Sequence, residues 1–487
     1  MLKFNKKLLF SGMCLFALFL ILQSCDDEIF TTNPSDSITF SKDTLTFDTV
    51  FSTIGSTTGK FLVYNPNNKA IHISSVKLAG GASSQFRLNV DGAVNTDNSF
   101  SDIDISAHDS MYVFVEVTVN PTDVNSPVLV ADSVLFTVNG NLRTVRLEAF
   151  GQDVVLFKNK YLINNTTLLA NKPYLIYGYL AVDTAKTLTI PAGCKLYFHN
   201  NANLIVYGNL RVEGTFEKPV EMRGDRFDNM DFSTPVPYNY VAGQWGGIYL
   251  LGSGGNHLLQ NVIINSGYVG VYFSNDNRNE LPYLHIINSK IQNFVYYGIV
   301  VQNGNLLVEN SEISNTGSCT VYLSGGKHVF IQSTIANFYN SNLYEPSSRD
   351  KNPAMVIMGL YRMAPMETEI KNCIVAGTLK NELSIVSRFL PGYKGTFSSS
   401  FIRRDSIYTY SQFENITWHQ TDNAELFVHP KYDAEGNYYF NFMPDSLSSA
   451  RGIADPDIAS QYPLDLNGNS RLEDGTPDAG AYEWQGK

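Results

Sequence analysis

Apolar residues recur through most of this chain in short alternating runs, such as AIHISSVKL and MYVFVEVTV, that bury one face of a strand. Gly, Asn, Asp and Pro separate the runs, as expected for tight turns. The chain also contains 30 Phe and 28 Tyr, which favour strands. The pattern therefore predicts an all-β protein.

The amino-terminal segment has a different pattern. A basic start, MLKFNKK, precedes an apolar run at residues 8–22, which is short for a membrane span of about 20 residues and is typical of a signal peptide. The sequence LQSC that ends at Cys25 resembles the lipobox of bacterial lipoproteins. The resemblance implies that residues 1–24 are removed and that Cys25 carries a lipid anchor. An uncleaved anchor helix is the alternative.

The residues after Cys25 indicate where the protein is held. Asp26, Asp27 and Glu28 resemble the signal by which some Gram-negative bacteria place lipoproteins on the cell exterior. We therefore expect the extracellular face of the outer membrane, with membrane contact through the N-terminal lipid. The alternative is an acidic tether that simply stays solvated. The net charge of -11, with no clustered basic stripe in the sequence, argues against nucleic acid as a partner.

The next parts of the chain predict a tether and a first domain. Residues 25–45 are polar and lack periodicity, which suits a tether, and residues 46–152 contain alternating runs that predict a β-sandwich. The stretches VYNPNNKAIHISSVKL, VFVEVTVNP, FTVNG and VRLEAFG, in that order, resemble immunoglobulin-like modules of the abnormal-spindle and hydin type. The resemblance implies a spacer or a protein-binding platform.

An internal repeat marks residues 153–420. Ser289, Ser311 and Ser333 lie 22 residues apart, and the same spacing separates the Ile two positions later and the Asn four positions later. One period kept in several columns predicts a solenoid whose strands stack about 4.8 Å apart, with Ser and Ile as inward ladders. We expect the Asn column at turns, where each amide bonds to its counterpart on the next coil.

Residues 187–224 resemble the opening coils of a right-handed parallel β-helix of the pectate-lyase-like type, through the sequence TLTIPAGCKLYFHNNANLIVYGNLRVEGTFEKPVEMRG. The expected fold is therefore a sandwich followed by a β-helix. The remaining cysteines, Cys194, Cys319 and Cys373, are odd in number and scattered through strands. They predict core thiols and no disulfide framework.

Residues 421–487 break the repeat and form a predicted closing segment. D-x-x-G-x-x-R followed by D-x-G-A-x-E resembles the terminal segment of a group of bacterial β-helix proteins, and we expect it to cap the open end of the solenoid. The spacing that starts at Asp465 also hints at a calcium loop, but Ser470 replaces the required Gly. No metal or other cofactor is therefore expected. The motif residues are Asp465, Gly468, Arg471, Asp478, Gly480, Ala481 and Glu483.

The sequence predicts no catalytic residue of the kind that polysaccharide-cleaving β-helices use. No Asp column follows the repeat, and Lys371 and Arg388 lie 17 residues apart and share no column. Asp225, Asp228 and Asp231 cluster in one insertion, which leaves a two-carboxylate hydrolase as an alternative.

Two insertions are rich in aromatic residues, and loops on one flank of a solenoid commonly form its binding face. Because exposed aromatic rings stack on sugar rings, these insertions predict a glycan-binding surface. The alternative for Trp245 is a place in the core. The candidate ligand-binding residues are Tyr238, Tyr240, Trp245, Tyr344, Tyr361 and Arg362.

The tripeptide Asp, Ser or Thr, apolar recurs along the chain and resembles the acceptor sequence to which one group of Gram-negative bacteria attaches O-glycans. The alternative is a turn before a strand, which would produce the same pattern. The candidate acceptors are Ser37, Thr44, Thr49, Ser110, Ser133, Thr184, Ser406 and Ser446.

Together these features predict a non-catalytic surface lipoprotein, in which a spacer presents a β-helix that binds a polysaccharide or a surface protein. A polysaccharide lyase or glycoside hydrolase is the first alternative. A purely structural adhesin or stalk is the second.

Overall fold

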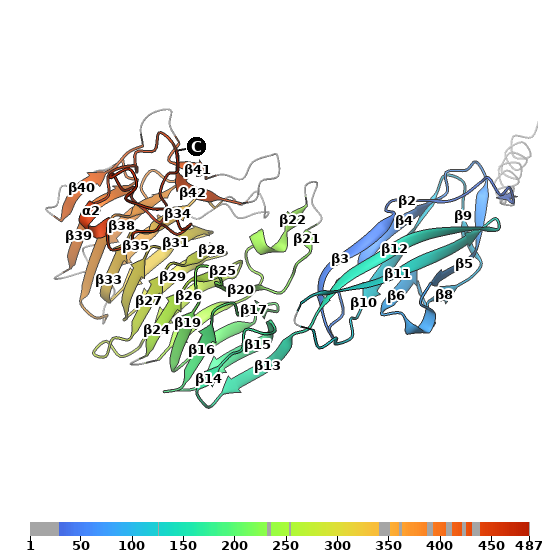
Figure 1. Cartoon of the computed structure of the whole chain (residues 1–487), viewed down its shortest axis with the longest axis horizontal. Coiled ribbons are helices and arrows are strands. Elements are labelled where there is room, and N and C mark those ends of the chain that lie inside the picture. The colour runs from blue at the N-terminus through green and yellow to red at the C-terminus, as the bar shows by residue number, and fades with distance from the viewer. Residues whose placement is uncertain are drawn as a thin grey trace, which may run out of the picture. The chain divides into compact units, whose positions relative to one another are not determined.

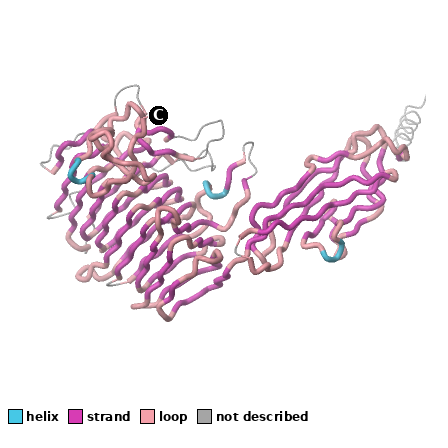
Figure 2. Tube along the Cα trace, viewed as in Figure 1, coloured by secondary structure: helices cyan, strands magenta, loops and turns pink. Residues whose placement is uncertain are grey.

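The computed structural model describes residues 29–124, 126–230, 235–252, 255–339, 351–359, 363–386, 393–405, 412–420, 425–430 and 439–486. The chain divides into two compact units, Met1–Asp153 and Val154–Lys487. The regular secondary structure of both units is almost entirely β-strand, which confirms the predicted all-β class (Figures 1 and 2). The predicted signal peptide and Cys25 lie outside the described residues.

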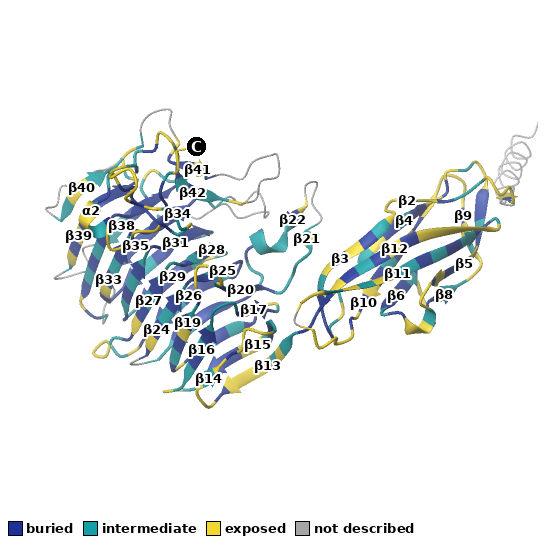
Figure 3. Ribbon diagram, in the orientation of Figure 1, coloured by how far each residue is buried: buried dark blue, intermediate teal, exposed yellow. Residues whose placement is uncertain are grey.

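The first unit is a β-sandwich of two sheets. Apolar side chains alternate along its strands and meet between the sheets, while the residues between them face solvent (Figure 3). One sheet contains β1 (Phe30–Thr31), β3 (Thr44–Phe51), β5 (Ala70–Leu78), β8 (Ser99–Phe100), β9 (Ile103–Ile105), β11 (Val128–Val138) and β12 (Asn141–Gln152). The other contains β2 (Thr39–Phe40), β4 (Gly59–Tyr64), β6 (Phe86–Val90), β7 (Ala93–Val94) and β10 (Ser110–Val117).

The sandwich begins earlier than the sequence pattern predicts. β1 and β2 lie in the segment expected to be a tether, and each pairs with a strand of the sandwich. Ile38, between them, is 0% exposed. The segment from β1 to Leu45 is therefore part of the domain, because its strands pair with the sandwich and Ile38 and Leu45 are buried there.

The second unit is a parallel β-helix, a 26-stranded all-parallel assembly in which most strands pair with the strand three further along. Each regular coil therefore contributes one strand to each of three sheets. The first sheet contains β14 (Thr166–Thr167), β16 (Thr187–Pro191), β19 (Asn209–Glu213), β24 (Asn256–Gln260), β27 (Tyr283–Ile287), β30 (Asn305–Glu309), β33 (Gly326–Ile331), β36 (Met366–Lys371) and β39 (Lys394–Ile402).

The second sheet, called the flank sheet below, contains β15 (Tyr174–Val182), β17 (Lys195–Phe198), β20 (Val220–Gly224), β25 (Val262–Asn265), β28 (Lys290–Phe294), β31 (Glu312–Thr316), β34 (Thr334–Asn337) and β37 (Ile374–Gly377). The third contains β18 (Asn203–Val206), β23 (Gly247–Leu251), β26 (Val269–Ser274), β29 (Tyr297–Gln302), β32 (Val321–Ser324), β35 (Met355–Met358) and β38 (Leu383–Val386). β13 (Val155–Leu162) pairs with β15, and β40 (Phe413–Thr417) pairs with β39.

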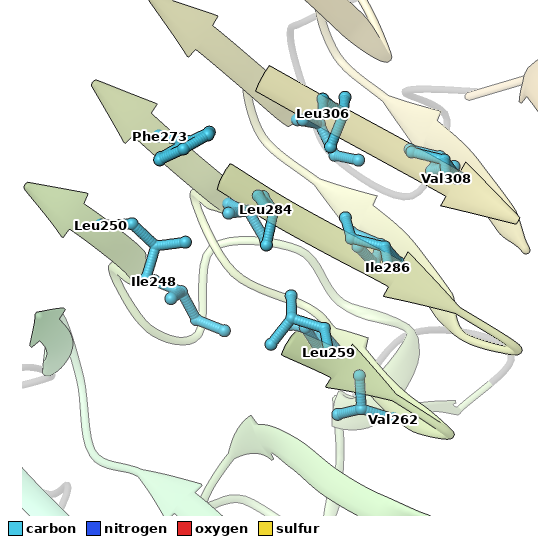
Figure 4. Packing of buried hydrophobic residues seen from close by; sticks show 14 of the residues in the cluster. Ile248, Leu250, Leu259, Val262, Phe273, Leu284, Ile286, Leu306 and Val308 are labelled. Carbon is cyan, nitrogen blue, oxygen red and sulfur yellow. The ribbon is translucent and has the colours of Figure 1, made fainter. Parts of the chain in front are cut away.

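The core of the β-helix is built from inward ladders of identical or similar residues. Ile291, Ile313 and Ile335 are paired in register on successive coils and are 0% exposed, as the repeat predicts. Neighbouring coils stack in the same way, with aliphatic side chains meeting inside the solenoid (Figure 4). Cys194, Cys319 and Cys373 are free and buried, which confirms the prediction of core thiols.

Two polar columns connect the coils. The N–H of Ser289 donates to Oγ of Ser311 at 3.0 Å, and the N–H of Ser311 donates to Oγ of Ser333 at 3.2 Å, so the Ser ladder satisfies one backbone group per coil. The Asn column differs from the expectation. Asn315 accepts from the N–H of Phe338 at 3.1 Å, so its amide bonds the backbone of the next coil and not its Asn counterpart.

The C-terminal segment, with β41 (Phe427–His429), β42 (Asn441–Pro444) and α2 (Pro456–Ala459), lies against the outer side of the β-helix. The N–H of Gly480 donates to the carbonyl of Asn372, and the N–H of Ala481 donates to Oγ1 of Thr334. The motif is therefore hydrogen-bonded to coils of the β-helix. Its residues contact the flank sheet, and we call residues 461–486 the clasp.

Candidate functional site

The first coils of the flank sheet and the insertion after β20 form one polar and aromatic surface. In-register pairing places Tyr197 of β17 beside Arg223 of β20. The insertion then folds back as a hairpin of β21 (Asn229–Met230) and β22 (Val236–Pro237), followed by the single turn η2 (Tyr238–Tyr240). We call this surface the flank site.

A stacked pair at its centre joins two coils. The rings of Tyr177 and His199 lie 4.1 Å apart with an interplanar angle of 15°. Nδ1 of His199 lies 2.8 Å from Oδ2 of Asp225, whose side chain is 15% exposed, whereas His199 is 45% exposed. Burial raises the pKa of Asp225, and the hydrogen bond with His199 opposes that rise. The site therefore presents an imidazole edge to solvent, held by a ring on one side and a carboxylate on the other.

The insertion adds a second charged and aromatic pair. The guanidinium of Arg226 lies 3.5 Å from the centre of the Tyr238 ring, and its Nε donates to Oδ1 of Asp228 at 2.9 Å. The N–H of Tyr238 donates to the carbonyl of Asp228, so the same residue holds both partners. The Arg226 guanidinium, which is held by Asp228, therefore orients the Tyr238 ring at the surface through a cation–π contact.

Beneath these groups the site rests on a buried layer. Arg223 is 8% exposed, donates from Nε to the carbonyl of Gly224 and lies 4.6 Å from the centre of the Phe227 ring. Phe227 in turn meets Tyr197 edge to face at 5.0 Å. Burial raises the pKa of Tyr197, so its hydroxyl stays protonated. These contacts fix the start of the insertion against β17 and β20.

Trp245 corrects one prediction. It is 0% exposed, stacks on Phe198 at 4.3 Å and donates from Nε1 to the carbonyl of Asn265 at 2.8 Å. Its ring is part of the core, because both its apolar faces and its one donor are satisfied inside the β-helix. Trp245 therefore offers no surface to a ligand.

The other predicted residues are distributed unevenly. Tyr238 and Tyr240 are half-buried and belong to the flank site. Tyr344, Tyr361 and Arg362 lie outside the described residues, as do the predicted positions Asp231, Arg388 and Ser406.

Sequence reasoning missed Tyr177, Tyr197 and His199. A signal was present, because Tyr177 and His199 are separated by the 22-residue period of the repeat. Outward positions carry no apolar pattern, however, and a polar column is visible only when the register of the coils is known.

The carboxylates of the flank site are engaged by other side chains of the same chain. Asp225 pairs with His199, and Asp228 pairs with Arg226. Among the described residues no group of three or more His, Cys, Asp or Glu side chains could hold a metal ion. The arrangement is suited to stacking and hydrogen bonding rather than to holding a cation.

The suspected calcium loop has another role. The carboxylate of Asp465 accepts hydrogen bonds from the N–H groups of Asn467 at 2.8 Å, Asn469 at 2.7 Å and Glu483 at 2.9 Å. Its oxygens therefore hold the two halves of the clasp motif together.

The predicted O-glycan acceptors share a local geometry. The N–H groups of Thr49, Ser110, Ser133 and Thr184 each donate a hydrogen bond to Oδ1 of the preceding Asp, at 2.7 to 2.8 Å. This contact gives the Asp-Ser/Thr pattern a structural reason that is independent of modification. Ser110, Thr184 and Ser446 are exposed, and Thr44, Thr49 and Ser133 are half-buried. Oγ of Ser37 is enclosed, which argues against this residue as an acceptor in the folded chain.

None of the helices in the described part of the chain is long and apolar enough to cross a membrane. No protein-family model matches the sequence, and no curated protein does.

Some solved structures show partial likeness. A PapD-like domain of human CEP192 matches 27% of this chain and 96% of its own length, with 14% identity and a TM-score of 0.17. A family 123 glycoside hydrolase from Clostridium perfringens matches 25% of this chain and 30% of its own, with 8% identity and a TM-score of 0.17. The Vibrio cholerae VesB protease matches 25% of this chain and 33% of its own, with 10% identity and a TM-score of 0.17. Such scores carry no functional argument.

Proposed function

We propose that this chain is a lipid-anchored protein of the cell envelope, held at the outer membrane through Cys25, whose flank site binds a polysaccharide without cleaving it. The observation that carries the proposal is the half-buried stack of Tyr177 and His199 beside the Arg226–Tyr238 pair. Sugars present apolar ring faces and hydroxyl groups, so they are bound by aromatic rings flanked by donors and acceptors. The flank site offers both within one surface.

The engaged carboxylates support binding over turnover. A two-carboxylate hydrolase needs one carboxylate that protonates the leaving oxygen and another that attacks or activates water. Asp225 is hydrogen-bonded to His199, and Asp228 is paired with Arg226. The sandwich unit, resembling modules that act as spacers, would extend the β-helix away from the lipid.

A glycoside hydrolase or lyase remains the second candidate, with one observation in its favour. Burial raises the pKa of Asp225, which is the direction required of a general acid. Release of oligosaccharides separates the two functions, because binding alone yields none.

The test uses the soluble chain from Asp26 onward and a panel of polysaccharides. Retention in affinity electrophoresis and the release of new sugar ends are measured on the same samples. We expect retention without release, and Tyr177→Ala should weaken it about three- to tenfold through loss of ring stacking. Tyr112→Ala is the matched control, since Tyr112 is an exposed ring on the sandwich, at 45% exposure.

Retention that is equal in Tyr177→Ala and wild type would place the binding surface elsewhere. Release of sugar ends, abolished by Asp225→Asn, would establish the enzyme in place of the binding protein. The absence of both retention and release would favour the adhesin or stalk.

A further inference from the structure

A cavity of ≈ 500 Å³ lies where the clasp crosses the flank sheet. One wall comes from the turn after β19 and from β25 and β28, and the opposite wall comes from residues 461–468 of the clasp. Its size is that of a small-molecule site, which typically measures roughly 300–1,000 Å³. The apolar side chains that line it include Phe216, Val262, Ile263, Ile287, Leu464 and Leu466.

The walls of the cavity are held together by hydrogen bonds that leave its apolar lining side chains free for contact with a ligand. Nδ2 of Asn310 donates to the carbonyl of Leu464 at 3.2 Å, and the N–H of Leu466 donates to the carbonyl of Ala481 at 2.9 Å. The hydroxyl of Tyr462 donates to Glu309 on β30. The cavity is therefore preformed, which lowers the ordering cost of binding.

Its lining contains two charged side chains, Lys290 and Asp465. The oxygens of Asp465 are occupied by backbone N–H groups of the clasp. Lys290 forms no ion pair with any described residue, and its Nζ lies 5.2 Å from the centre of the Tyr482 ring. Glu312 lies beside Lys290 in the register of the sheet, and its carboxylate accepts hydrogen bonds from the hydroxyls of Ser314 and Tyr482. A ligand in the cavity would thus meet apolar walls and one positive charge.

We propose that this cavity binds a small amphipathic anion, with an apolar body between β25 and the clasp and a carboxylate or sulfonate beside Lys290. The proposal is independent of glycan binding, because none of its residues belongs to the flank site. A fatty acid and an aromatic acid share this chemistry, and the two are distinguished by competition.

The probes are 8-anilinonaphthalene-1-sulfonate and N-phenyl-1-naphthylamine, which have the same rings with and without the charge. Each is titrated by fluorescence into the soluble chain from Asp26 onward, and dodecanoate is tested as the competitor. Leu464→Trp and Ile263→Trp fill the cavity from opposite walls. Leu447→Trp is the control, because Leu447 is 69% exposed, belongs to the C-terminal segment and does not line the cavity.

We expect saturable binding at one site, weakened at least about tenfold for both probes by either filling variant and unchanged in Leu447→Trp. Lys290→Met should weaken the sulfonate probe about fivefold and leave the neutral probe unchanged. Displacement of the sulfonate probe by dodecanoate would identify a fatty-acid site, whereas saturable binding of the probe that dodecanoate does not displace would favour an aromatic acid. Circular dichroism verifies that each variant is folded.

The absence of saturable binding to the wild-type chain would overturn the proposal. So would unchanged affinity in both filling variants when both are folded. Equal weakening of the two probes by Lys290→Met would refute the anionic assignment.

Discussion

Replacing Arg471 by Ala tests whether a buried charge holds the clasp to the β-helix. Arg471 is 0% exposed, and its Nη2 donates to Oδ1 of Asn310 at 2.6 Å. Its Nη1 lies 3.7 Å from Oε2 of Glu483, which is itself 4% exposed. The guanidinium thus joins the clasp to the turn before β31 and to the second half of its own motif.

The expected cost follows from these contacts. A hydrogen bond from a charged donor contributes about 1.5–3 kcal/mol. Loss of the guanidinium also leaves the buried acidic side chains around it without an opposite charge. Asp465 and Asp478 also act on the Arg471 charge, and removal of one member of such a buried ionic group typically costs about 3–5 kcal/mol. We therefore expect the free energy of clasp opening to fall by about 3–5 kcal/mol in Arg471→Ala.

Hydrogen exchange of peptides covering residues 464–484 measures this opening directly. A loss of this size corresponds to exchange faster by about two to three and a half powers of ten. Arg451→Ala is the matched control, because Arg451 stacks on Trp484 at 3.6 Å and is half-buried, so its loss should cost about 0.5–1 kcal/mol. An Arg471→Ala effect no larger than that of Arg451→Ala would refute the reasoning.

Three further perturbations test the core and the clasp. Ile313→Ala should lower the free energy of unfolding by about 2–5 kcal/mol in urea denaturation, because it opens a cavity in the Ile ladder. The control, Leu447→Ala, should change the free energy of unfolding by less than about 0.5 kcal/mol. Similar losses in the two variants would contradict a core role for Ile313. Burial raises the pKa of Glu483 to about 8 from 4.5, so its stabilising contribution is complete below pH 4.5 and lost as the pH rises through 8. Glu483→Gln should remove this decline in stability with rising pH. If the stabilities of the wild type and the variant change with pH in parallel, Glu483 does not cause the decline. Burial raises the pKa of the Cys373 thiol to about 12, so iodoacetamide should modify it only after denaturation, and rapid modification of the native chain would disprove its burial.

The coil register could be read from the sequence because a ladder needs like residues at like positions. Ile313 and Ser311 occupy inward and turn positions that every coil must fill, so their columns repeat at a fixed period. The outward columns are not constrained in this way, and Tyr177 and His199 had no pattern of their own. The position of the clasp was also hidden, because Arg471 meets Asn310 across 161 positions of sequence.

By itself, the sequence determined the class of the fold, the 22-residue coil and the buried thiols, since each follows from periodicity and burial within one or two coils. Only the tertiary structure decided that Trp245 is core, that residues near Ile38 belong to the sandwich, and that the C-terminal motif lies along the flank. It also decided which polar side chains meet. These features depend on contacts between segments far apart in the chain, whose free energy is set by shape and hydrogen-bond geometry that no local pattern encodes.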